Sequence, residues 1–267
     1  MEHMLEALVP QVYYLIELLG THLITVQASV SGPTVYYEID LFGAHLPITK
    51  AVLAVWASAL VVFLMVFIPS RRVKLIPGRF QGTIESLLEF SRDQLVHDIM
   101  GKEGKPFFPF VATLFLFIFV INLVGLIPGA YAATSETGTT AAFAVIVFLL
   151  YNLAGAIKHG PLRYLKNTFV PDVPVLMLVL MIPIELVSHI ARPFSLAIRL
   201  FANVLAGHMV VSTFATLAVG VVWWLKPLPF TMIVIMDIFE VVVAFLQAYI
   251  FAIISAIYIG SAVNADH

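Results

Sequence analysis

The stretch that decides the fold is "VLMLVLMIPIELVSHIARPFSLAIRLFANVLAGHMVVSTFATLAVGVVW", residues 175–223. It is apolar over about 49 residues, and a helix that rises about 1.5 Å per residue would be roughly 70 Å long. The hydrocarbon core of a bilayer is only about 30 Å thick. A straight, upright span is therefore excluded. The helix either breaks at Pro183 or Pro193 or lies steeply tilted, and we favour steep tilt with local kinks.

The composition of the whole chain is that of a membrane protein. Of its 267 residues, 61% are hydrophobic and 11% are charged, and the mean hydropathy of +1.02 is far above that of ordinary soluble domains. The formal net charge of -2 excludes a strongly basic protein that binds nucleic acid. The chain has no cysteine, which excludes thiolate catalysis and cysteine-ligated metal or iron–sulfur sites.

Other apolar stretches are long enough to cross a membrane, because a span needs about 20 mostly apolar residues. We therefore predict an all-α integral membrane protein with membrane-embedded helices at about 51–69, 106–127, 139–157, 175–223 and 229–262. The last two are long and are expected to form a hairpin. An amphipathic pattern also predicts a surface helix at about 83–99, which joins the first two spans.

The N-terminal part differs from the rest. Residues 1–49 are predicted to form a segment outside the membrane, and residues 50–267 to form the membrane domain. Apolar residues at helical spacing within residues 5–19 predict an amphipathic helix on the membrane surface. The segment 30–49 contains glycine, proline and the alternating sequence TVYYEID, which predicts an ordered loop or a small hairpin.

Basic residues predict the orientation, since short cytoplasmic loops collect lysine and arginine. The connections after the first and third spans are rich in them, whereas the other connections hold at most one each. The basic residues of these two connections are Arg71, Arg72, Lys74, Arg79, Arg92, Lys102, Lys105, Lys158, Arg163 and Lys166. This distribution predicts an N-terminus outside and a C-terminus inside.

Polar residues recur within the first of the two long helices. Glu185, Arg192 and Arg199 are seven residues apart, and Asn203 follows four residues after Arg199. These spacings place the side chains on one slowly drifting stripe. His208 lies nine residues after Arg199, which puts it about half a turn away from that stripe.

The last helix carries polar residues at matching depth. Counted from the connection at 224–228, His208 and Glu240 lie at similar distances, and Arg199 and Gln247 lie at similar, greater distances. Ionisable groups in a bilayer cost roughly 2.5–3.5 kcal/mol each on insertion scales, so they usually line a water-filled cavity or meet partners. A purely structural membrane anchor would not need an acid, a base and an arginine at matched depths.

Three segments of the chain resemble subunit a of the F-type rotary ATP synthases. They are "IARPFSLAIRLFANVLAGH" at 190–208, "DIFEVVVAFLQAYIFAIISAIYIG" at 237–260 and "NLVGLIPG" at 122–129. The similarity extends over about residues 41–263. In that family the arginine of the R-L-x-x-N-x-x-A-G pattern is essential for ion translocation, and it falls on Arg199.

Further residues match polar positions of the family near that arginine. Asn203 and Gln247 match directly. Some members carry an acid where this chain has His208 and a histidine where it has Glu240, so the acid and the base are exchanged here. The exchange leaves open which of the two is protonated first.

The resemblance implies a stator beside a rotating ring of c subunits, held by the b subunits of a peripheral stalk and surrounded by membrane lipid. An outer half-channel would deliver protons to a carboxylate on each c subunit, and an inner half-channel would drain them. Arg199 would promote release of the proton and block a leak between the half-channels. The implied lining is His208, Glu240 and Asp237 for the outer half-channel, and Glu185, Ser188 and His189 for the inner one.

Alternatives stay open for several of these assignments. Arg192 either snorkels to the interface or takes part in transport, and His189 and Asp237 are equally compatible with structural groups. The transported ion is a proton or sodium. A secondary ion-coupled transporter is the other functional class, although the sequence has no inverted repeat.

Catalytic and cofactor motifs are not found in the sequence. It contains no Walker A, H-E-x-x-H or G-x-S-x-G pattern, so we expect no catalytic site, cofactor or metal on this chain. The expected location is a bacterial plasma membrane, with an organelle inner membrane as the alternative.

Overall fold

The computed structural model describes residues 35–41, 44–71, 78–127, 130–169, 175–222 and 224–264. The chain divides into two compact units, Met1–Lys50 and Ala51–His267. In the first unit, strands β1 (Val35–Leu41) and β2 (Ala44–Thr49) pair antiparallel. The hairpin alternative is thus confirmed for residues 35–41 and 44–49, whereas the amphipathic helix predicted within residues 5–19 lies outside the described residues.

Five helices in the described part of the chain are long and apolar enough to cross a membrane. They are α2 (Lys50–Arg71), α5 (Phe108–Gly125), α6 (Thr137–His159), α8 (Val175–Gly220) and α9 (Pro227–Val263). Their ends lie close to those predicted, because apolar length and flanking Pro or Gly set them. For example, α6 stops before Gly160, whose φ of 84° suits a residue that closes a helix.

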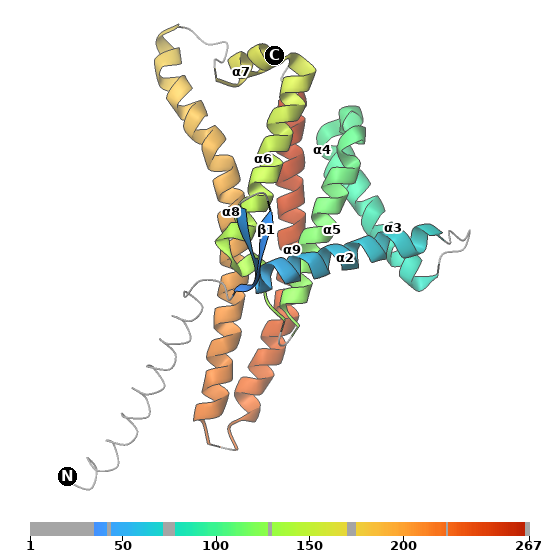
Figure 1. The fold of residues 1–267 in the computed structure, drawn as a ribbon, viewed down its shortest axis with the longest axis vertical. Coiled ribbons are helices and arrows are strands. Elements are labelled where there is room, and N and C mark those ends of the chain that lie inside the picture. Colours follow the sequence, from blue (N-terminus) through green and yellow to red (C-terminus); the bar gives the residue numbers. More distant parts are fainter. Residues whose placement is uncertain are drawn as a thin grey trace, which may run out of the picture. The chain divides into compact units, whose positions relative to one another are not determined.

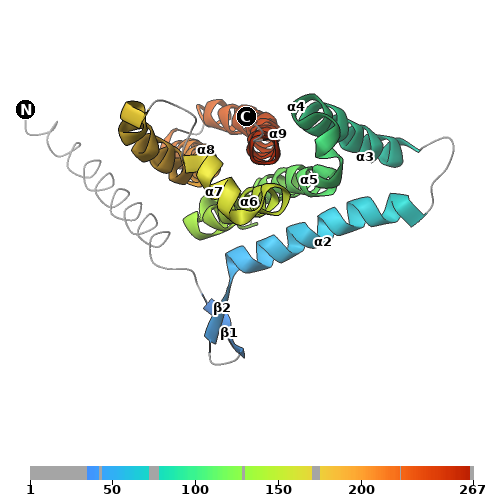
Figure 2. The same ribbon diagram turned by 90° about the horizontal axis from the view of Figure 1, so that it is seen from above.

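Within the second unit, α5, α6, α8 and α9 run alongside one another, and α2 runs across them (Figures 1 and 2). α2 has 22 residues and is about 33 Å long, which matches a hydrocarbon core when the helix stands upright. α8 has 46 residues and is about 69 Å long. An orientation that keeps α2 upright therefore lays α8 and α9 at a steep tilt. α8 is one helix that contains Pro183 and Pro193 and bends along its length (Figure 1).

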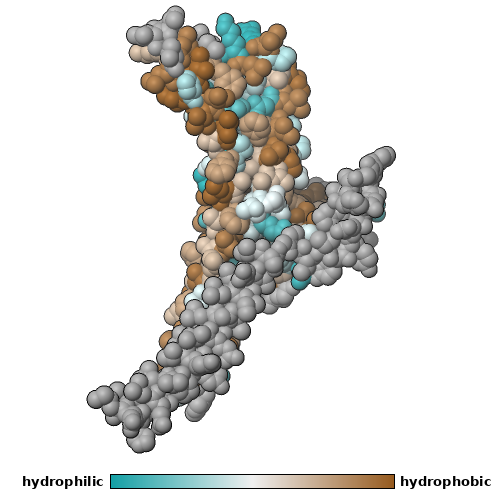
Figure 3. Space-filling view, turned by 60° about the vertical axis from the view of Figure 1, so that its left-hand side comes forward, coloured by the Kyte–Doolittle hydropathy of each residue, from teal (hydrophilic) through white to brown (hydrophobic). Residues whose placement is uncertain are grey.

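The core lies where α5, α6, α8 and α9 meet. α9 contributes a buried stripe of small residues at a spacing of four: Ala244, Ala248, Ala252 and Ala256. Small residues let helix backbones approach closely in membrane proteins, and α9 accordingly packs against α5, α6 and α8. Leu196 and Leu200 form a buried face of α8. Much of the remaining surface of α8 is apolar and exposed (Figure 3), as expected for a surface that meets lipid or another subunit.

The connection between α2 and α5 is helical, and the surface helix predicted at about 83–99 lies within an unbroken helical run over residues 79–100 that contains one π-helical turn. α3 (Arg79–Phe90) continues into a π-helical turn, η1 (Ser91–His97), then α4 (Asp98–Met100) and a 3-10 helix, η2 (Gly101–Phe107). A π-helical turn has i→i+5 hydrogen bonds, and here it forms where η1 packs on α5 and α9. The predicted apolar face does point inward, since Ile84 and Leu95 are buried.

Candidate functional site

A polar cavity lies between α5, α8 and α9. Apart from apolar residues, it is lined by Asn122, Asn203, His208, Glu240 and Gln247. Its volume is about 30 Å³, and roughly 10–15 Å³ is enough to hold one water molecule. An acid, an imidazole and three amides from three helices thus surround a space that has room for water. His208 and Glu240, predicted at the same depth, line this one cavity.

Glu240 reaches the cavity because Gly207 leaves room for it. A Cβ atom added to Gly207 would lie 2.5 Å from Glu240 Oε1 and 2.9 Å from its Cδ. Glu240 Oε1 is buried and has no hydrogen-bond partner among the described residues. A buried polar oxygen without a partner is costly, so protonation or a water molecule in the cavity would satisfy it.

A larger groove of about 460 Å³ adjoins the cavity and shares Glu240 and Gln247 with it. Most of its other lining is apolar and includes small residues: Ala206, Gly207, Val210, Met236, Phe239, Val243, Leu246 and Ile250. Asn203 and Ala206 line it from α8. Arg199 lies about one turn before Asn203 on α8, but it lines neither the cavity nor the groove.

A short hydrogen bond joins the two long helices at this level. Asn203 Nδ2 donates to Gln247 Oε1 at 2.6 Å. Gln247 is only 2% exposed, and its Nε2 has no partner among the described residues. Arg199 is half-buried and forms no hydrogen bond or ion pair with another described residue. Since a guanidinium stays charged, Arg199 is a cation whose counter-ion the described part of the chain does not supply.

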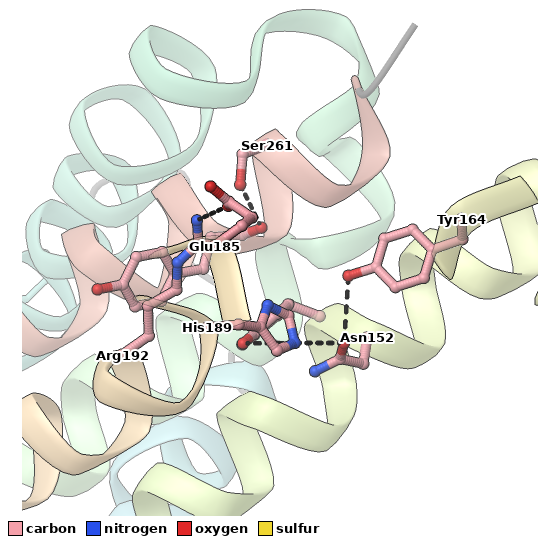
Figure 4. A network of polar contacts seen from close by, with 8 residues as sticks. Asn152, Tyr164, Glu185, His189, Arg192 and Ser261 are labelled. Atoms are coloured by element: carbon pink, nitrogen blue, oxygen red, sulfur yellow. Dashed lines mark hydrogen bonds and ion pairs between the residues drawn. The ribbon is translucent and has the colours of Figure 1, made fainter. Parts of the chain in front are cut away.

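Glu185 and His189, two of the three residues predicted for the inner half-channel, belong to a second polar cluster that α8 forms with its neighbours (Figure 4). Arg192 Nη2 lies 3.7 Å from Glu185 Oε1. Its guanidinium carbon lies 5.2 Å from the ring centroid of Tyr258 on α9, within the range of a cation–π contact. Arg192 therefore has an anion on its own chain, in contrast to Arg199.

His189 is buried, at 5% exposed, and lines neither the cavity nor the groove. Its Nε2 lies 3.0 Å from Asn152 Oδ1, which also accepts a hydrogen bond from Tyr164 Oη at 3.2 Å. Tyr164 belongs to the short helix α7 (Pro161–Phe169). Asn152 thus ties α6 to both α7 and α8 (Figure 4).

The remaining predicted residues lie apart from the cavity. Ser188 is half-buried and Asp237 is exposed, and neither lines the cavity or the groove. Asp237 lies about one turn before Glu240 on α9. No group of three or more His, Asp or Glu among the described residues could hold a metal ion.

Sequence reasoning missed Asn122. This residue is 5% exposed and lines the cavity from α5, and its Nδ2 has no partner within the described residues. The available signal was a lone amide near the end of a span whose other polar side chain is Thr113, since polar groups within membranes usually have a partner or a function. The Asn122 side chain lies on the same cavity as His208 and Glu240 because of how α5 packs against α8 and α9. The spacing of residues within one helix does not predict that packing.

Several known proteins of one family are similar to this chain. The profile of the family described as ATP synthase A chain matches residues 52–260. A protein named ATP synthase subunit a from Xanthobacter autotrophicus is 39% identical over 226 residues, which cover 82% of this chain and 89% of that protein. The protein of the same name from Acidiphilium cryptum is 43% identical over 216 residues, covering 78% and 84%. A third, from Rhodospirillum rubrum, is 40% identical over 195 residues, covering 72% and 79%.

Proposed function

Because the chain belongs to the family of ATP synthase subunit a, the non-catalytic, proton-translocating membrane subunit of the F-type enzyme, we propose that it conducts protons through two offset half-channels. The protons pass between these half-channels on a ring of c subunits, and b subunits of a peripheral stalk hold the chain still. The relatives are bacterial, which supports a bacterial plasma membrane as its location.

The outer half-channel consists of the polar cavity and its lining. His208 and Glu240 relay protons there, because an imidazole and a carboxylate around a space with room for water can exchange protons through it. Asn203 and Gln247 form the deep wall of the path. Asp237, exposed one turn before Glu240, lies at its outer mouth.

Arg199 separates the two half-channels, and its lack of a counter-ion among the described residues is the observation that carries the proposal. A cation in a membrane needs an anion, and a carboxylate on each c subunit supplies one when it faces the groove. The guanidinium favours the ionised carboxylate and thereby releases its proton. It also repels protons, so they do not pass directly from one half-channel to the other.

The inner half-channel drains protons past the first half of α8. Glu185 is half-buried and paired with Arg192, which gives this path a carboxylate near its surface. Ser188 lies on the same part of the helix. His189 supports the path from its buried position against Asn152.

The experiment that tests the proposal exchanges the acid and the base of the outer half-channel. We expect His208→Ala and Glu240→Ala each to lower proton-driven ATP synthesis by about tenfold or more, because each removes a proton-transfer group. The double variant His208→Glu with Glu240→His is expected to restore much of the rate, since both groups face one cavity. Synthesis is measured in sealed vesicles per assembled complex, with Val241→Ala as the control on the exposed side of α9. Wild-type rates in both single variants would contradict the proposal.

A further inference from the structure

The connection between α5 and α6 folds back into the helices instead of running over the surface. Its 3-10 helix η3 (Ala133–Ser135) packs against α5, α6 and α8, and Ala132 and Ala133 are buried. Loops normally stay on the surface because their backbone groups need water. This one comes close to α5 because Gly125 has no side chain: a Cβ atom there would lie 3.1 Å from Ala132 Cβ.

Thr134 is the polar residue that the folded-back connection carries inward. It is 0% exposed, and its Oγ1 donates a hydrogen bond to Asn122 Oδ1 at 2.9 Å. The other end of that amide, Asn122 Nδ2, is buried and has no partner among the described residues. Asn122 lines the same cavity as His208 and Glu240. One hydroxyl from the loop therefore holds one end of an amide whose other end belongs to the cavity wall.

We infer that Thr134 is a positioning residue for proton delivery: its hydroxyl fixes the Asn122 amide so that Nδ2 offers its N–H groups to the cavity lined by His208 and Glu240. This inference rests on the proposed function of that cavity. An amide nitrogen donates hydrogen bonds and does not accept them, so in this orientation it can bind the free oxygen of Glu240 or a water molecule between the two. Proton transfer needs such short, aligned contacts.

The hydroxyl matters because nothing else among the described residues bonds the Asn122 side chain. The terminal torsion of an asparagine is broad and roughly two-fold, so without Thr134 the amide could turn its carbonyl toward the cavity. A carbonyl oxygen cannot donate to the carboxylate of Glu240. The loop would then keep its shape, but the Asn122 amide would no longer present its N–H groups to the cavity.

The test compares Thr134→Val, which keeps the shape and removes the hydroxyl, with Thr134→Ser, which keeps the hydroxyl. The matched control is Thr140→Val, because Thr140 is also buried and bonds only the backbone carbonyls of Glu136 and Thr137. ATP synthesis is measured in sealed vesicles, per assembled complex, as a function of the proton concentration on the outer side. For Thr134→Val we expect the half-saturating proton concentration to rise roughly three- to tenfold, the factor that one neutral hydrogen bond is worth.

Thr134→Ser and Thr140→Val are expected to retain the wild-type proton dependence. Equal shifts in Thr134→Val and Thr140→Val, or no shift in Thr134→Val, would overturn the inference, because a purely structural role changes the amount of assembled complex rather than its proton dependence. Glu240→Ala in the same vesicles distinguishes a failure of the role inferred for Thr134 from a failure of the function proposed for the cavity. If Glu240→Ala lowers synthesis about tenfold or more while Thr134→Val has no effect, the inference alone fails. If both Glu240→Ala and His208→Ala keep the wild-type rate, the proposed function fails with it.

Discussion

Asn203 and Gln247 join the two longest helices through a hydrogen bond of 2.6 Å, one turn of α8 away from Arg199. The bond lies where the cavity and the groove adjoin, since both residues line both spaces. It therefore sets the spacing of α8 and α9 at the level where the proposed half-channels meet.

The first prediction concerns this pair. Asn203→Ala and Gln247→Ala should each lower the rate of proton-driven ATP synthesis, and the double variant should lose less than the sum of the two losses. The coupling is expected to be about 1 kcal/mol, the size of one neutral hydrogen bond. Asn203→Ala combined with Thr231→Ala, in the first turns of α9, serves as a pair that should be additive. Additive losses for Asn203 and Gln247 would show that the bond has no part in transport.

The second prediction concerns Gly207. In Gly207→Ala, the new Cβ would lie 2.5 Å from Glu240 Oε1 and 2.9 Å from Cδ, closer than a van der Waals contact, so the carboxylate must move while the backbone of α8 stays in place. We expect normal assembly and a roughly tenfold lower rate of proton-driven synthesis, because a displaced proton-transfer group is inefficient. Gly220→Ala is the matched control on the same helix, since nothing lies within 4 Å of its added Cβ. Equal rates in the two variants would count against Glu240 as a relay.

The third prediction concerns the tie between α6, α7 and α8. Asn152→Leu removes the acceptor of Tyr164 Oη. It also removes the closer of two partners of His189 Nε2, because Tyr151 Oη lies 3.5 Å from the same nitrogen. A buried polar group left without its partner costs about 1–3 kcal/mol, so less assembled complex should survive heating. Leu153→Ala, at the exposed neighbouring position, should leave the surviving fraction unchanged. The fraction is measured as the amount of this chain retained in the complex after heating, and an unchanged fraction in Asn152→Leu would refute the tie.

The fourth prediction concerns pH. Burial, together with a hydrogen bond of 2.6 Å to Glu136 Oε1, raises the pKa of Tyr131 to about 12, above the ordinary value of about 10. The folded protein thus favours the neutral hydroxyl. The contribution of the neutral Tyr131 hydroxyl to the free energy of unfolding is fully present below about pH 10 and is lost as the pH rises through about 12.

This dependence is measured as the difference in thermal inactivation temperature between the wild type and Tyr131→Phe. The difference should stay constant from about pH 7 to 9 and shrink above about pH 10. Glu136→Gln, which keeps an acceptor for the hydroxyl, should behave like the wild type in the lower range. A difference that already disappears between about pH 7 and 9 would contradict the assignment.

The sequence predicts the helices better than it predicts their contacts. Apolar length and terminal Pro or Gly residues placed the long helices correctly, because a membrane fixes how many apolar residues a span needs. The π-helical turn at Ser91–His97 was not predicted, since its hydrogen-bond register forms against α5 and α9. The folded-back loop was missed for a related reason: Ala132 meets Gly125 only when the loop returns to α5.

The candidate site shows the same limit. Helical spacing and depth suggested that His208 and Glu240 belong together, and both line one cavity. Asn122 was missed because α5 has no second polar residue at helical spacing that would indicate a face. The contact between His189 and Asn152 could not be predicted either, since Asn152 lies 37 residues earlier in the chain and on another helix.

The most direct measurement replaces Arg199 by alanine in the assembled complex and follows both ATP synthesis driven by a proton gradient and passive proton permeability in sealed vesicles. Ile198→Ala, at an exposed neighbouring position, serves as the control. We expect Arg199→Ala to assemble, to lose proton-driven synthesis and to let protons leak, because the cation that separates the half-channels is gone. Unchanged synthesis without a leak would contradict the role of Arg199 and leave it as a structural residue.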